Sequence, residues 1–143
     1  MKLEDVQSFA ASQITAVPEL AAFGAPIEFD PSMDEVELRE LIATRLHIAG
    51  VCIEIVEDEV SRTSDSATSR GITADVLFNV FVSQNTKLPH TPTGKALRKS
   101  VIDAVVKFIP QETRAEFLKS ETAINEHGYV LYAISFTIRV TIP

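Results

Sequence analysis

The chain has 143 residues, of which 45% are hydrophobic, and a chain of this length buries roughly 70% of its unfolded surface in one domain. The formal net charge of −7 argues against a protein that grips nucleic acid phosphates, because each such contact uses a lysine or an arginine. The single cysteine, Cys52, excludes an internal disulfide framework, and no apolar run reaches the ~18 residues of a membrane span. We therefore expect one soluble cytoplasmic domain over residues 1–143, without a membrane partner.

Three segments show the spacing of amphipathic helices. In each of them apolar residues recur every three or four positions, so that they line one side of a helix. Pro18 and Pro110 mark the ends of the first and the third segment, and Gly50 follows the second as a C-terminal cap. Ser32 and Glu35 have the spacing of a capping box at the start of the second segment. The predicted helices cover 3–17, 33–48 and 96–109.

Four segments show the alternation of apolar and other residues that is typical of strands. The clearest is the last one, in which every second residue from Val130 to Ile142 is apolar. A turn at 125–128 indicates that the preceding segment pairs with it as a hairpin. A connecting segment at 22–31 contains at most a very short extended piece, at 27–29. The predicted strands cover 51–60, 72–83, 117–124 and 129–142.

The order of these elements, α-α-β-β-α-β-β, predicts an α+β fold with a mostly antiparallel four-stranded sheet packed by two to three helices. Residues 61–71 contain six Ser or Thr and no large apolar group, so we expect a long hairpin loop there. Strand 129–142 would span about 46 Å, whereas a compact domain of this length is roughly 37 Å across. Long hairpin ribbons should therefore extend past the body of the domain, where another copy of the chain can cover them.

Gly94 and Lys95 stand where a loop is predicted to meet a helix, as the equivalent residues do in a phosphate-binding loop. That loop also needs a glycine five residues before its Gly-Lys pair, and Pro89 occupies this position. Ala96 follows the lysine in place of the Ser or Thr that binds Mg²⁺. The segment is therefore interpreted as an ordinary helix N-terminus without a bound nucleotide.

The other candidates for catalysis or metal binding are three histidines and the cysteine. His47, His90 and His127 have no metal-ligand spacing among themselves or with Cys52. No serine stands in the motif of a nucleophile elbow. We therefore expect no catalytic residue, no cofactor and no metal site, and we predict that the protein is not an enzyme.

Charged residues at the first hairpin are candidate contacts with another subunit or with a partner protein. Glu54 and the run 57–59 form an acidic cluster, which is typical of an exposed sheet edge but could also serve acid–base chemistry or bind a divalent cation. Arg62 and Arg70 lie eight residues apart and could form ion pairs with acids of a neighbouring subunit. The candidate contact residues are Glu57, Asp58, Glu59, Arg62, Asp65, Arg70 and Arg139.

Four segments carry a resemblance to a known family: "VCIEIVEDEV", "ITADVLFNVFVSQN", "GKALRKSVIDAVVKFI" and "GYVLYAISFTIRVTIP". In order and size they resemble the tail terminator family of long-tailed phages, whose members cap the tail tube as rings. The resemblance implies a structural protein of the virion, assembled in the host cytoplasm, that forms a ring of six copies. It also implies contacts with the tail tube protein and with neck or head-completion proteins, while DNA passes through without sequence-specific binding.

Other interpretations stay open at this stage. Two helices precede the first strand, where the family pattern has one, so residues 1–30 are considered as an added N-terminal arm. Neck and head-completion proteins of the same viruses share the small α+β size and the assembly into rings. A small enzyme or ligand-binding domain, with the acidic run 57–59 or His90 in its site, and a regulatory interaction module are the alternatives from other classes.

Overall fold

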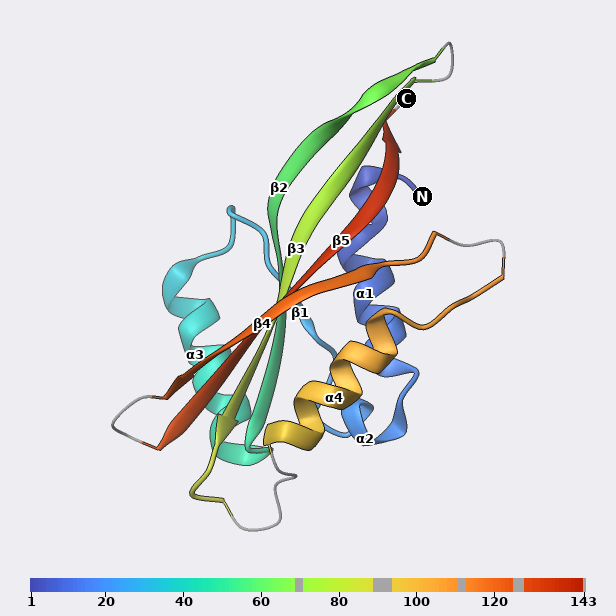
Figure 1. The fold of residues 1–143 in the computed structure, drawn as a ribbon. Helices are drawn as coiled ribbons and strands as arrows, with labels where there is room; N and C mark the ends of the chain where they lie inside the picture. The colour runs from blue at the N-terminus through green and yellow to red at the C-terminus, as the bar shows by residue number, and fades with distance from the viewer. Residues whose placement is uncertain (69–70, 89–93, 111–112, 125–127, 143) are drawn as a thin grey trace.

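The computed structural model describes residues 1–68, 71–88, 94–110, 113–124 and 128–142, and it shows a five-stranded sheet with helices on both sides (Figure 1). The strand order is β1-β2-β3-β5-β4; β1 is parallel to β2, and all other neighbours are antiparallel. The predicted α+β class is therefore confirmed, with one more strand than expected. The strands are β1 (Ile27–Glu28), β2 (Val51–Thr68), β3 (Gly71–Asn85), β4 (Glu116–Ile124) and β5 (Tyr129–Ile142).

The predicted helices at 3–17 and 96–109 differ from the observed ones at their ends. The first begins with a 3₁₀ turn and ends at Thr15, two residues earlier than predicted. Pro18, which lacks a backbone N–H, then begins a short new helix as its first residue. The last ends at Val105, five residues before Pro110, and Phe108 is exposed. The helices are the 3₁₀ turn η1 (Leu3–Asp5), α1 (Val6–Thr15), α2 (Pro18–Ala21), α3 (Glu35–Ile48) and α4 (Gly94–Val105).

The neighbouring strands β3 and β5 each supply five residues to the core, more than any other element. Alternate residues of β3 from Ala74 to Val82 are buried, which is the pattern of a strand with one face against an apolar layer. Phe78 and Phe136 lie opposite each other in the β3–β5 ladder and stack with ring centroids 5.4 Å apart. We call the side of the sheet that carries these buried residues the helix face, because α1, α2 and α4 pack against it.

The N-terminal residues belong to this core. Val6, Ala10, Ile14 and Leu20 are all buried against the helix face, and the backbone N–H of Thr141 donates a hydrogen bond of 3.0 Å to the carbonyl oxygen of Met1. Residues of the segment 1–30, considered above as an added N-terminal arm, thus pack into the core of their own chain, where burial of the apolar stripe of α1 contributes to stability.

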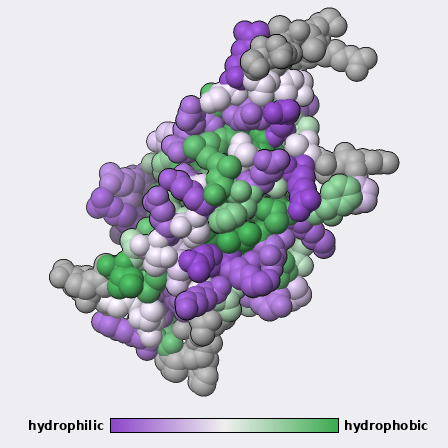
Figure 2. Space-filling view, in the orientation of Figure 1, coloured by the Kyte–Doolittle hydropathy of each residue, from purple (hydrophilic) through white to green (hydrophobic). Residues whose placement is uncertain are grey.

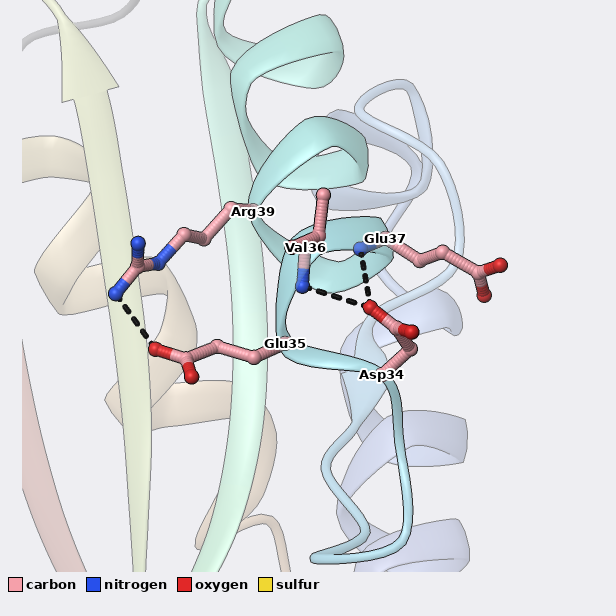
Figure 3. A network of polar contacts seen from close by, with 5 residues as sticks. All are labelled: Asp34, Glu35, Val36, Glu37 and Arg39. Atoms are coloured by element: carbon pink, nitrogen blue, oxygen red, sulfur yellow. Dashed lines mark hydrogen bonds and ion pairs between the residues drawn. The ribbon is translucent and has the colours of Figure 1, made fainter.

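Helix α3 lies on the opposite side of the sheet from α1 and α4, against β2 and β3 (Figure 1). Its N-terminal cap is Asp34, whose carboxylate accepts hydrogen bonds from the backbone N–H groups of Val36 and Glu37 at 2.9 and 3.2 Å (Figure 3). The predicted capping box from Ser32 does not form, because Ser32 instead donates to the carboxylate of Asp30. The helix therefore begins two residues later than the sequence predicts.

The first hairpin is paired for more of its length than expected. Strand β2 continues to Thr68 and β3 begins at Gly71, so most of the predicted loop at 61–71 is strand. The pairing is irregular between Arg62 and Ala67, where the Thr63 hydroxyl donates a hydrogen bond of 2.9 Å to the carbonyl oxygen of Thr73. Polar Ser and Thr side chains are compatible with a solvent-exposed ladder that satisfies backbone groups. The resulting ribbon projects past the body of the protein (Figure 1).

Candidate interaction surfaces

The side of the sheet that faces away from α1 and α4, which we call the open face, is only partly covered. Asn79 of β3 and Ser135 of β5 lie opposite each other at its centre, and the Ser135 hydroxyl donates a hydrogen bond of 2.7 Å to Asn79 Oδ1. A shallow hollow of about 450 Å³ surrounds this pair. Its lining combines apolar and charged side chains: Asp58, Leu77, Phe81, Leu118, Lys119, Glu121 and Ala133.

The upper part of the open face carries an ion pair. Asp75 and Arg139 are opposite each other in the β3–β5 ladder, and Arg139 Nε lies 3.1 Å from Asp75 Oδ1. The side chains of Arg139 and Asp75 are 64% and 41% exposed, so water screens the pair and it contributes about 0–1 kcal/mol to stability. A smaller hollow of about 250 Å³ beside it is also lined by Arg114, Glu116 and Thr137. The predicted contact residue Arg139 thus already has a partner within its own chain.

The acidic run of β2 is divided between the two faces of the sheet. Glu57 pairs with Phe78 and points to the helix face, whereas Glu59 pairs with Leu77 and points to the open face. Asp58 is the extra residue of a β-bulge between them. Asp58 and Glu59 are thus directed to the open face and Glu57 to the helix face. No group of three or more side chains that could hold a metal ion occurs among the described residues.

Burial affects two carboxyl groups of this strand. It raises the pKa of Glu54 and the pKa of Glu57 above their ordinary value, because partial removal from water destabilises the charged carboxylate relative to the neutral acid. Beside the same stretch lies a hollow of about 390 Å³, which is lined by Gln7, Phe29, Asp30, Pro31 and residues 57–60. The outer side of β2 is thus recessed at the point where β1 ends.

Several residues considered from the sequence lie outside the described part of the chain. These are Arg70, His90, His127 and Pro89, together with the side chain of Asp65. Arg62 is exposed on β2. Its contact with a second subunit stays a prediction, as do the contacts proposed for Arg70 and Asp65.

Gly94 has a packing role that the sequence did not reveal. A Cβ atom at this position would lie 2.1 Å from the Oη atom of Tyr132, so only glycine allows α4 to begin this close to β5. The guanidinium of Arg98 lies over the same ring, 5.4 Å from its centroid. The Gly-Lys pair that resembles a phosphate-binding loop therefore marks a close contact between a helix and an aromatic side chain.

Strand β4 is an exposed edge of the sheet, and it carries apolar side chains that sequence reasoning did not select. Phe117, Leu118 and Ile124 are 43%, 51% and 77% exposed. Figure 2 shows a hydrophobic group at the free end of the β4–β5 hairpin, and a second one in the middle of the same view, bordered by hydrophilic residues. The weak alternation of β4 was the available signal, since an edge strand without a buried face need not alternate.

No helix in the part of the chain that the structure describes is long and apolar enough to cross a membrane.

Comparison of the sequence with models of protein families and with curated proteins gives no match. Comparison with solved structures finds a similar chain in the structure titled "Virion of native gene transfer agent (GTA) particle". The two chains are 20% identical, and the match covers 95% of this chain and 94% of the other with a TM-score of 0.60. The two proteins therefore share a fold over nearly their whole length.

Proposed function

We propose that this chain is a structural protein of a phage-like virion and that it acts as a tail terminator. In this role, six copies form a ring that caps the tail tube and joins it to the neck or the head. The observation that carries the proposal is the likeness of fold, over 95% of the chain, to a chain of a gene transfer agent virion. The resemblance of the element order to tail terminators supports the finer assignment.

The surfaces of the molecule favour assembly over catalysis. Three of its hollows lie along an edge or a face of the sheet, where another protein chain can fit. The β2–β3 ribbon and the exposed apolar residues of β4 provide contact area for neighbouring copies, the tail tube protein and the neck or head-completion proteins. The protein would thus act by shape and self-association, in the host cytoplasm during assembly and afterwards in the virion.

The charge of the open face suits a ring through which DNA passes without sequence-specific binding. Two described strand residues of this face are basic, Lys119 and Arg139. A surface with more acids than bases repels phosphates and therefore does not retain DNA. Six described strand residues of the face are acidic: Glu54, Asp58, Glu59, Asp75, Glu116 and Glu121.

Native mass spectrometry and negative-stain microscopy of the purified protein test this function, with and without the tail tube protein of the same genome. We expect rings, mainly of six copies, and tubes that carry a ring at one end and stop growing. A protein that stays monomeric at high concentration and leaves tube length unchanged would contradict the proposal. Rings that bind DNA-filled heads but never tubes would instead identify a neck or head-completion protein.

A further inference from the structure

The sheet has two edges that can accept another strand. On β4, the side away from β5 has no neighbouring strand among the described residues. On β2, the side away from β3 is covered by β1 only at Glu54 and Ile55, and the hydrogen bond from Phe29 N–H to the Ile55 carbonyl oxygen ends that contact. Each edge therefore presents a row of backbone groups to which a second chain can be paired.

The directions of the two edge strands are opposite. From β2 through β3 and β5 to β4, each strand is antiparallel to the one before it, so β2 and β4 run in opposite directions. Rotation about a ring axis that lies roughly along the strands preserves these directions. In such a ring, β4 of one copy meets β2 of the next in the antiparallel orientation, as a hairpin partner would.

Each of the two edge strands contains a β-bulge with one extra residue. On β2, Asp58 is the extra residue between two ladder pairs, so Asp58 and the next residue, Glu59, both lie toward the open face. On β4, the extra residue is Leu118, and it lies toward the open face together with Lys119. When the two bulges oppose each other, the side chains on both strands point to matching faces along the whole overlap.

We propose that β4 of one copy pairs antiparallel with the outer half of β2 of a second copy, with the two bulges opposed. This inference rests on the ring proposed above and names the contact that builds it. In this register the two residues of each opposed pair point to the same face of the joined sheet. The pairs are Glu116 with Ser61, Phe117 with Val60, Leu118 with Glu59, Lys119 with Asp58, and Ser120 with Glu57.

The apolar pair of this register removes two exposed side chains from water. Phe117 and Val60 are 43% and 44% exposed in the single chain, and both lie on the helix-face side of their strands. Val60 lines the hollow of about 390 Å³ beside the outer side of β2, next to Phe29 and Pro31. The arriving strand would fill this hollow with Phe117, which is the kind of aromatic anchor that stabilises interfaces.

The polar pairs are complementary in charge and in hydrogen bonding. Lys119 is the only cation of β4, and the register places it opposite Asp58 of the second copy, with Glu59 as the next residue along that strand. Ser120 Oγ is buried and has no hydrogen-bond partner among the described residues. The register offers this hydroxyl the carboxylate of Glu57, which can accept its hydrogen bond.

A symmetric contact between two β4 strands is the main competitor. With a two-fold axis at Ser120, it would pair Lys119 of each copy with Glu121 of the other. That contact uses one edge and leaves the edge of β2 without a partner. The contact between β4 and β2 uses both edges of every copy and continues from copy to copy, which a ring requires.

Disulfide cross-linking of the full chain tests the contact and its register. We expect Asp58→Cys with Lys119→Cys in one chain to give, under mild oxidation, a ladder of covalent oligomers up to the size of the ring. Opposed residues of an antiparallel pair have Cα atoms about 4.5–5.5 Å apart, which a disulfide spans. A mixture of the two single variants should give covalent dimers and nothing larger.

Control variants distinguish the proposed register from other registers and from the symmetric β4 contact. They also separate a failure of this contact from a failure of the proposed function. Ser61→Cys with Glu121→Cys should not cross-link, because the proposed register places these residues five positions apart, or about 16 Å. Covalent dimers from Ser120→Cys alone would overturn the proposal in favour of the symmetric β4 contact, because the two-fold axis of that contact places residue 120 of one copy opposite residue 120 of the other. Rings seen by native mass spectrometry without any Asp58–Lys119 cross-link would overturn the contact and leave the tail terminator function standing. The absence of both rings and cross-links would contradict both.

A charge reversal gives an independent measurement. Lys119→Glu should weaken subunit association by about tenfold, because it opposes a carboxylate to Asp58 and Glu59 across the interface. Asp58→Lys in the same chain should restore most of the ring population at equal protein concentration. Full ring formation by the Lys119→Glu variant, folded as judged by circular dichroism, would contradict the proposed register.

Discussion

Gly94 and Tyr132 touch so closely that a methyl group at position 94 would overlap the tyrosine ring, with its Cβ atom 2.1 Å from Oη. We expect Gly94→Ala to lower the free energy of unfolding by about 1–3 kcal/mol, the range for overpacking in a core. Urea unfolding followed by circular dichroism measures this change. Lys95→Ala is the matched control, and it should change stability by less than about 0.5 kcal/mol because Lys95 is exposed. Equal losses of stability in Gly94→Ala and Lys95→Ala would contradict the expected overlap between a Cβ atom at position 94 and Tyr132.

Asp34 and Ser32 distinguish the observed start of α3 from the predicted one. Asp34→Ala should cost about 1 kcal/mol, because its carboxylate accepts hydrogen bonds from two N–H groups of the first helical turn. Ser32→Ala should cost clearly less, since the Ser32 hydroxyl contacts Asp30 and not the helix. Thermal unfolding of the two variants compares them directly, and a larger loss from Ser32→Ala would support the capping box predicted from the sequence.

Glu54 should make stability depend on pH in the direction opposite to that of a salt-bridged acid. Burial raises its pKa above the ordinary value, so the folded state binds the proton more tightly than the unfolded state. The contribution of Glu54 is therefore least favourable at neutral pH, and it improves as the pH falls through the raised pKa toward the ordinary value. Glu54→Gln should remove this improvement and raise stability at pH 7.

Urea midpoints between pH 7 and pH 4 measure the effect of Glu54. Glu19→Gln serves as the control, because this glutamate lies exposed on α2. A wild-type protein and a Glu54→Gln variant with parallel pH profiles would contradict the expected linkage.

Cys52 should be unreactive in the folded protein. Burial raises the pKa of its thiol to about 11, so little thiolate forms near neutral pH, and the side chain is only 2% exposed. We expect a thiol reagent at pH 8 to label the wild-type chain only after denaturation. Thr44→Cys provides an exposed thiol on α3, away from the proposed contact between copies, and should be labelled at once in the folded state. Rapid labelling of Cys52 would indicate that the edge of the sheet near β1 opens readily.

The elements that the sequence predicts well are those whose pattern is imposed by one buried face. Strand β5 is confirmed over all of 129–142, because its alternation records contact with the helix layer on one side only. Strand β1 is different, since two residues become a strand only by pairing with Glu54 and Ile55 of β2. The predicted loop at 61–71 fails for a related reason: Ser and Thr carry no core signal, yet their backbone groups can still form a ladder.

The candidate surface was predictable only in part. The acidic run 57–59 is visible in the sequence, but its division between two faces depends on a bulge that is defined by the partner strand. The exposed edge of β4 depends on the strand order of the whole sheet. The partner of Arg139 within its own chain, Asp75, lies 64 residues earlier and is determined by the β3–β5 register.

The hydrogen bond between Met1 and Thr141 has a consequence for the time at which the chain can fold. Helix α1 packs against α4, and the residues before it contact β5, so segments that are far apart in the sequence must meet before the core is complete. Contacts of such wide sequence separation close large loops and slow the final folding step. A chain in which β5 has not yet joined β3 therefore lacks the completed sheet, and its β4 edge is not yet in place for a second copy.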